Sequence, residues 1–167
     1  MKKLLVLLTA VAFVLLGCGK SAEQKKMELD LSAQVQKLHD AGMASMKQVN
    51  ELTGKIDAAV AMHDSLIKAF PKLAAGHSSE DLIAAKEKLG AVKSAMDTWM
   101  KGFKPYNETM KHEEAVTMLK KNVEDLTKMK GEIDASVTAA TTAIDAHAKA
   151  AADLMAQASK TAKKVKK

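Results

Sequence analysis

Apolar residues recur with a 3-4 spacing between residues 31 and 70, and this repeat constrains the fold more than any other feature. One position of the repeat runs through Leu31, Leu38, Ser45, Leu52, Ala59 and Leu66. Its partner position runs through Val35, Gly42, Val49, Ile56, His63 and Phe70. This spacing is typical of a helix that presents one seam to a neighbouring helix. Pro71 ends the segment, because proline disfavours helical geometry in the residue before it.

The same repeat continues in two further segments. The second runs through Leu82, Leu89, Met96 and Phe103 beside Ala85, Val92 and Trp99. The third runs through Leu119, Leu126, Ile133, Ala140, His147 and Leu154 beside Val123, Lys130, Val137, Ile144, Ala151, Ala158 and Val165. Both connections are short, which favours antiparallel neighbours. The sequence therefore predicts an all-α fold, an elongated antiparallel bundle of three long helices.

The third helix is too long for its neighbour. Its register continues through Gly131, so we expect one helix from Asn107 to Val165 of roughly 90 Å, against about 36 Å for the second helix. The third helix then overshoots the bundle or bends back near Gly131. We expect a bundle over residues 27–134 and an Ala/Lys-rich C-terminal helix with a basic tail over 135–167. That last part needs a partner, either another copy or the same chain folded back.

Composition supports helices and argues against nucleic acid as a partner. Aromatic residues make up only 3% of the chain and prolines number two, so bulky side chains for a compact globular core are scarce. The formal net charge is +6, and every basic residue is lysine. Specific recognition of phosphate or guanine normally uses the bidentate guanidinium of arginine. Its absence counts against sequence-specific nucleic-acid binding.

The N-terminus has the layout of a secretory signal. Met1-Lys2-Lys3 is followed by the apolar run Leu4 to Leu16, which is too short to span a bilayer. Leu15-Leu16-Gly17-Cys18 resembles the bacterial lipobox, in which the cysteine receives a diacylglyceryl group and the chain is cut before it. The resemblance implies a signal peptide over 1–17, a covalent diacylglycerol and N-acyl lipid on Cys18, and a polar tether over 18–26. The alternative is a secreted protein with an accidental cysteine.

The same resemblance bears on the compartment. With Cys18 lipidated, the mature chain has no free thiol for disulfides, catalysis or metal binding. Gly19 stands where an aspartate would, in many Gram-negative lipoproteins, signal retention in the inner membrane. We expect a cell-envelope protein that is lipid-anchored in the outer membrane and faces the periplasm.

Three short clusters resemble a known group of proteins. They are HDAGMASM at 39–46, MDTWMKGF at 96–103 and HEEAVTML at 112–119. In this order they resemble small helical lipoproteins of Bacteroidota-like bacteria that are loosely labelled "viral A-type inclusion protein". The resemblance covers residues 38–134. It implies a helical fold and an envelope location, and no activity.

Histidine and methionine supply the candidate metal ligands. His39, Met43 and Met46 lie at i, i+4 and i+7, on one helix face. Thioether and imidazole groups suit Cu(I), although methionine also fills gaps in a core that is short of aromatics. We expect the core role, and so no metal site. His63 and His147 fall on seam positions and are expected to be core residues that form hydrogen bonds or reach water.

Trp99 and the pair Glu113-Glu114 receive structural interpretations. Trp99 is expected to anchor the corner between the second and third helices. Glu113 and Glu114 stand in the first turns of the third helix, where negative charge complements the helix dipole. Sequence neighbours on an exposed helix do not face each other, so a paired acid and base is not expected. No catalytic residue is predicted.

The C-terminal segment is strongly basic. Its lysines are Lys160, Lys163, Lys164, Lys166 and Lys167, and the last acidic residue before them is Asp153. Such a segment suits contact with anionic groups of the envelope, or plain solvation at a helix end. A lipidated Ala- and Lys-rich helix ending in lysine also resembles murein lipoprotein, which implies covalent attachment of Lys167 to peptidoglycan.

These observations predict a lipid-anchored structural or interaction lipoprotein of the cell envelope, without catalytic activity. Its expected partners are the membrane, a cell-wall component or another envelope protein, and further copies of the chain through the heptad seams. Peptidoglycan tethering through Lys167 and copper binding through His39, Met43 and Met46 are the alternatives.

Overall fold

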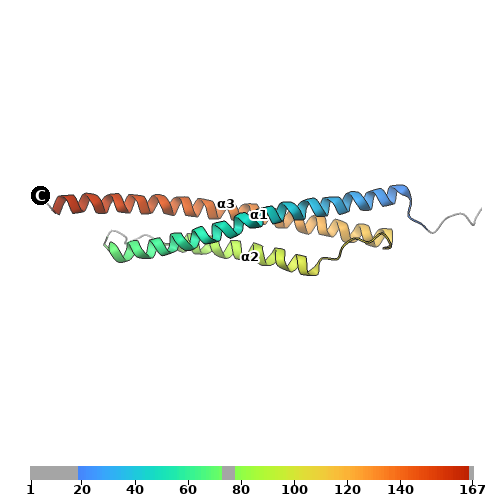
Figure 1. Cartoon of the computed structure of the whole chain (residues 1–167), viewed down its shortest axis with the longest axis horizontal. Coiled ribbons are helices and arrows are strands. Elements are labelled where there is room, and N and C mark those ends of the chain that lie inside the picture. The colour runs from blue at the N-terminus through green and yellow to red at the C-terminus, as the bar shows by residue number, and fades with distance from the viewer. Residues whose placement is uncertain (1–18, 73–77, 166–167) are drawn as a thin grey trace, which may run out of the picture.

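The chain folds into three helices that form a thin rod (Figure 1). The computed structural model describes residues 19–72 and 78–165, and no strand occurs within them. Helix α1 spans Ala22–Ala69, α2 spans Glu80–Gly102 and α3 spans His112–Val165. The predicted all-α bundle is confirmed. Among the described residues, no helix is both long enough and apolar enough to cross a bilayer.

The helices run up, down and up. α1 and α3 are parallel and lie side by side, while α2 runs in the opposite direction and packs along part of both (Figure 1). At 1.5 Å per residue their lengths are about 72, 35 and 81 Å. α3 packs mainly along α1, so the seam between these two helices is the axis of the molecule.

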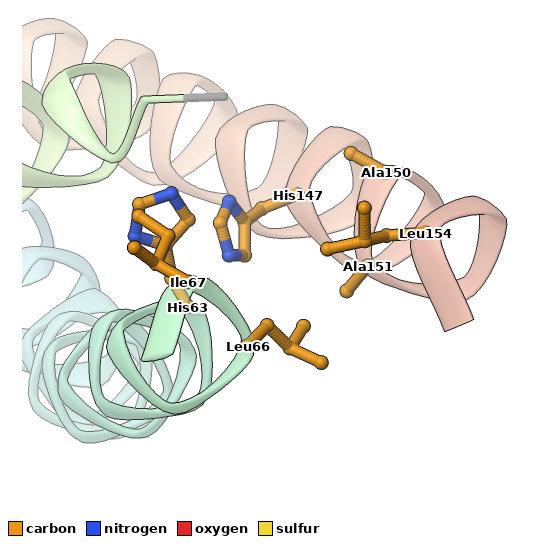
Figure 2. Close-up of a pocket in the computed structure, with 7 residues that line it drawn as sticks. All are labelled: His63, Leu66, Ile67, His147, Ala150, Ala151 and Leu154. Atoms are coloured by element: carbon orange, nitrogen blue, oxygen red, sulfur yellow. The ribbon is translucent and has the colours of Figure 1, made fainter. Parts of the chain in front are cut away.

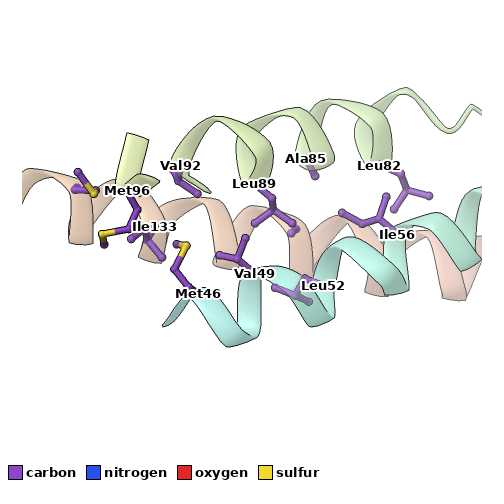
Figure 3. Packing of buried hydrophobic residues seen from close by; sticks show 12 residues of the cluster. Met46, Val49, Leu52, Ile56, Leu82, Ala85, Leu89, Val92, Met96 and Ile133 are labelled. Carbon is purple, nitrogen blue, oxygen red and sulfur yellow. The ribbon is translucent and has the colours of Figure 1, made fainter. Parts of the chain in front are cut away.

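The predicted seam positions form the core. In α1, Val35, Val49 and Ile56 are buried, and their counterparts from α3 include Leu126 and Ile133. Where α2 covers the seam, a larger cluster forms that includes Leu82, Leu89 and Met96 (Figure 3). Full burial of each large aliphatic side chain contributes about 1.5–3 kcal/mol, so this cluster is the main stabilising element of the rod.

α3 is a single helix and does not bend back at Gly131. It overshoots α2, as expected, but the prediction that its Ala-rich half needs a second copy or a reversed chain was wrong. α1 supplies the partner: Ala59 and Val60 pack in the same cluster as Ile144, and Leu66 meets Leu154 farther along. The prediction compared α3 with the short α2 alone, whereas α1 has 48 residues.

Two helix starts differ from the predictions. α1 begins at Ala22, inside the segment expected to be a tether, because Ser21 and Gln24 form a capping box. The Ser21 Oγ accepts from the Gln24 backbone N–H at 3.1 Å, and the Gln24 side chain accepts from the Ser21 N–H at 2.9 Å. α3 begins at His112 rather than Asn107, because the Asn107 side chain accepts from the Thr109 N–H at 2.9 Å and forms a turn instead.

Candidate functional site

A buried carboxylate interrupts the apolar seam near the start of α1. Glu28 stands one heptad before Val35, on the same seam position, and its side chain has no exposed surface. Acidic side chains are almost never fully buried unless they are paired. The surroundings of Glu28 are therefore the first place to look for a site.

Three donors from three separate segments meet the Glu28 carboxylate. The Lys20 Nζ donates to Oε2 at 2.7 Å from just before α1, and the Tyr106 hydroxyl donates to the same oxygen at 2.5 Å from the loop after α2. The His112 Nδ1 lies 2.9 Å from Oε1 at the first residue of α3. The Lys20 Nζ also lies 5.6 Å from the centre of the Tyr106 ring, within the range of a cation–π contact. We call these four residues the carboxylate hub.

The hub fixes the protonation of its members. Burial alone would raise the pKa of Glu28, but hydrogen bonds from Lys20, Tyr106 and His112 outweigh it and lower the pKa to about 2. The hydrogen bond to Glu28, followed by burial, raises the pKa of Tyr106 to about 12. Glu28 is thus ionised at neutral pH. Because an ionised carboxylate only accepts, the His112 Nδ1 carries a proton.

The hub connects the start of the described chain to the rest of the fold. Lys20 precedes α1 and is only 13% exposed at its side chain, while Tyr106 and His112 belong to the corner that leads into α3. A charged, buried hydrogen-bond network of this kind holds its members in one arrangement. The site is therefore a fastening point between the first described residues and the body of the rod.

A second polar pair lies at the other end of the same seam. His63 of α1 is 7% exposed, in agreement with the predicted core position. The His147 ring of α3 lies beside it, with ring centroids 5.1 Å apart and planes tilted by 56° (Figure 2).

The suggested methionine and histidine ligands differ in burial and in their neighbours. Met46 is buried in the main core, whereas Met43 is 41% exposed. The His39 ring stacks on Trp99 with centroids 5.8 Å apart, and its Nδ1 lies 3.3 Å from an Asp40 carboxylate oxygen. Met46 thus has the expected core position, whereas Met43 does not.

The remaining predicted residues are placed in part. Trp99 packs against Phe103, with ring centroids 4.9 Å apart, and contributes to both core clusters at the corner before α3. Glu113 and Glu114 are exposed in the first turn of α3. The signal peptide 1–17, Cys18, Lys166 and Lys167 lie outside the described residues, as do the side chains of Lys163 and Lys164.

The sequence interpretation did not find the hub, although half of it left a signal. Extending the α1 repeat back from Val35 leads to Glu28, and extending the α3 repeat back from Leu119 leads to His112. An acid and a histidine on facing seam positions would have indicated a buried pair. Lys20 and Tyr106 left no such signal, because they come from irregular segments without a repeat.

Comparison with known proteins finds no family model that matches the chain, and no similar curated protein or solved structure.

Proposed function

We propose that this protein is a lipid-anchored structural lipoprotein of the cell envelope, which holds a helical rod at a fixed distance from the membrane. Lipidation of Cys18 in the outer membrane, facing the periplasm, is part of the proposal. The observation that carries it is the hub: Lys20 is fastened to Glu28, so only Gly19 separates the proposed lipid from the folded rod. A rod joined to its anchor in this way has little freedom to change its distance from the membrane.

The shape of the molecule supports the same role. The hub lies at one end of α1 and α3, and the C-terminal end of α3 lies at the opposite end of the rod (Figure 1). From His112 to Lys160, α3 extends for roughly 70 Å. The five lysines of residues 160–167 would therefore stand far from the membrane, where they suit contact with an anionic envelope polymer or protein.

The proposal includes no catalytic activity. An effective general acid or base has a pKa near the working pH, and the pKa of the buried Glu28 is about 2. The hydrogen-bonding capacity of this carboxylate is already directed to Lys20, Tyr106 and His112. These features suit a structural role.

The anchor is tested by fractionating cells that express the native chain or Cys18→Ser. We expect the native chain in the membrane fraction, resistant to salt and released by detergent, with the mass of a processed and acylated protein. The Cys18→Ser chain should keep its signal peptide or appear without lipid. A native chain that is fully water-soluble and carries no acyl groups would refute the anchor.

The fixed distance is tested on the lipidated chain in vesicles. A fluorescent label on Ser159→Cys near the far end, with an acceptor in the lipid, should report a separation of roughly 70 Å. The matched control is a label on Lys25→Cys near the hub, which should lie close to the bilayer. Equal transfer from both labels would show that the rod lies flat and would contradict the proposal.

Attachment of Lys167 to peptidoglycan is the second candidate, and the position of the C-terminal end of the rod favours it. Cell walls boiled in detergent should retain the native chain and release one that lacks Lys167. If both chains wash off with the lipids, covalent tethering is excluded and non-covalent contact through the basic segment is retained.

A further inference from the structure

His63 is a buried polar residue that lacks hydrogen bonds. Neither of its ring nitrogens has a hydrogen-bond partner within residues 19–72 and 78–165. An Asp64 carboxylate oxygen lies 3.7 Å from Nδ1 and belongs to a side chain that is 62% exposed. Buried polar groups are nearly always satisfied, and an exception points to a bound water or ion.

A small cavity lies beside this ring. His63 and His147 line it together with apolar side chains, which are Leu66, Ile67, Ala150, Ala151 and Leu154 (Figure 2). Its volume of about 10 Å³ is close to what a single water molecule or ion needs. An organic ligand does not fit, so an occupant of this cavity is one small species beside the two imidazole rings.

We propose that His63 and His147 bind a single Cu(I) ion. Imidazole nitrogen is a favourable ligand for copper. Metal–nitrogen bonds of about 2 Å bring the centres of two imidazoles on one ion to about 5–6 Å, and the observed separation is 5.1 Å. Each imidazole has two nitrogens, so one can bind the ion while the other forms a supporting hydrogen bond.

The apolar lining selects a monovalent ion. None of the described residues that line the cavity is a carboxylate, and the Asp64 carboxylate beside His63 is 62% exposed to solvent, so burying a doubly charged ion here is costly. Cu(I) carries one charge and needs only two or three ligands, and the ring separation of 5.1 Å corresponds to a bent arrangement of the two imidazoles on the ion. Zn²⁺ carries two charges and normally takes four ligands, which this pair does not supply.

Metal binding would join α1 to α3 at the end opposite the hub. His63 lies near the end of α1, and His147 of α3 lies beside the first turn of α2, where Asp81 and Leu82 line a neighbouring pocket with it. An ion that binds only the folded arrangement stabilises it in proportion to occupancy. The site would thus strengthen the α1–α3 seam at the end opposite the hub.

The test is an anaerobic titration of the full chain in detergent with Cu(I), in competition with the chromophoric chelator bicinchoninate. We expect one equivalent to bind, and affinity to fall at least a hundredfold in His63→Leu/His147→Leu. Leucine suits seam positions, so the double variant should fold, which circular dichroism checks. His39→Gln and Met43→Leu/Met46→Leu are matched controls that should bind as the native chain does.

Four results would overturn the assignment. The native chain could bind Cu(I) no more tightly than the double variant does, as expected if the cavity holds only water, or Met43→Leu/Met46→Leu could lose binding. The native chain could also bind Zn²⁺ as tightly as Cu(I), or the copper X-ray absorption spectrum could show a sulfur neighbour. The expected spectrum shows two nitrogen neighbours and no sulfur.

Discussion

Each end of the α1–α3 seam has a buried polar residue of α1 in an otherwise apolar repeat, but the hydrogen bonding of Glu28 differs from that of His63. Thirty-five residues separate Glu28 from His63, and the same number separates His112 from His147. Both pairs therefore occupy the same two seam positions, roughly 50 Å apart along the helices. At the first end the buried carboxylate accepts from three donors. At the other, the ring nitrogens of His63 find none in the described part of the chain.

The difference lies in what surrounds each pair. Beside Glu28, two irregular segments supply Lys20 and Tyr106 in addition to the partner helix. Around His63, the facing surfaces of two helices supply alkyl groups such as Leu66 and Leu154. Helix surfaces rich in Ala and Leu close an apolar seam well but offer few donors. Glu28 therefore receives hydrogen bonds from side chains of irregular segments. His63 has no such partner among the described residues.

Removing the hub carboxylate should have the largest effect on the stability of the fold. Glu28→Ala leaves Lys20, Tyr106 and His112 without their acceptor, and we expect Tm to fall by roughly 10 °C or more. Thermal unfolding followed by circular dichroism measures it. Glu51→Ala removes an exposed carboxylate from the same helix and should change Tm by only about 1–2 °C. Equal effects of the two substitutions would show that the hub contributes little.

Acid should weaken the hub through Glu28. Because its folded-state pKa of about 2 lies below the ordinary 4.5, the carboxylate stabilises the fold above about pH 4.5. That stabilisation is lost as the pH falls from there toward 2. Urea unfolding at a series of pH values should show the loss in the native chain and a flatter profile in Glu28→Gln. Parallel profiles would mean that other carboxylates cause the acid dependence.

Alkali should act on the same hub through Tyr106. Its pKa is raised from 10.0 to about 12, so its contribution is complete below pH 10 and is lost as the pH rises through 12. Tyr106 is the only tyrosine, so tyrosinate absorbance reports it directly. In Glu28→Gln the midpoint should move back toward 10. An unchanged midpoint would separate the tyrosine shift from the carboxylate.

The sequence was most informative where the fold is regular. One heptad position of each long helix is buried throughout, from Val35 to Ile56 and from Leu119 to Ala140, because a 3.5-residue repeat leaves one face for a partner. The partner positions are buried or half-buried. The repeat could not show that α3 pairs with the whole of α1, since periodicity gives a face but not a register. The hub was missed because Lys20 and Tyr106 meet Glu28 only through tertiary contacts.

Single leucine substitutions should separate the two ends by the sign of their effect. In the metal-free protein, His63→Leu replaces an unsatisfied buried ring with an apolar seam residue and should stabilise the fold by about 1 kcal/mol. His112→Leu removes a donor from Glu28 and should destabilise it. Urea unfolding in the presence of a strong metal chelator measures both. If His63→Leu destabilises the fold as His112→Leu does, the His63 ring is not an unsatisfied group in the folded protein.

The smallest expected effect is that of Gly131→Ala, which tests whether the two ends of α3 unfold independently of each other. Gly131 is exposed within α3, and a methyl group added there meets nothing within 4 Å. Gly131→Ala should therefore raise the free energy of unfolding by about 0.5–1 kcal/mol through backbone entropy alone.

Gly42→Ala is its control, because the added methyl would lie 2.6 Å from the Met96 Cε and force that side chain to move. Its gain should be smaller or absent. Hydrogen exchange should slow equally at the two ends of α3 in Gly131→Ala if the rod unfolds as one unit. If protection rises near His112 but not near His147, the end near His147 opens by itself, and a ligand between His63 and His147 would have local opening to suppress.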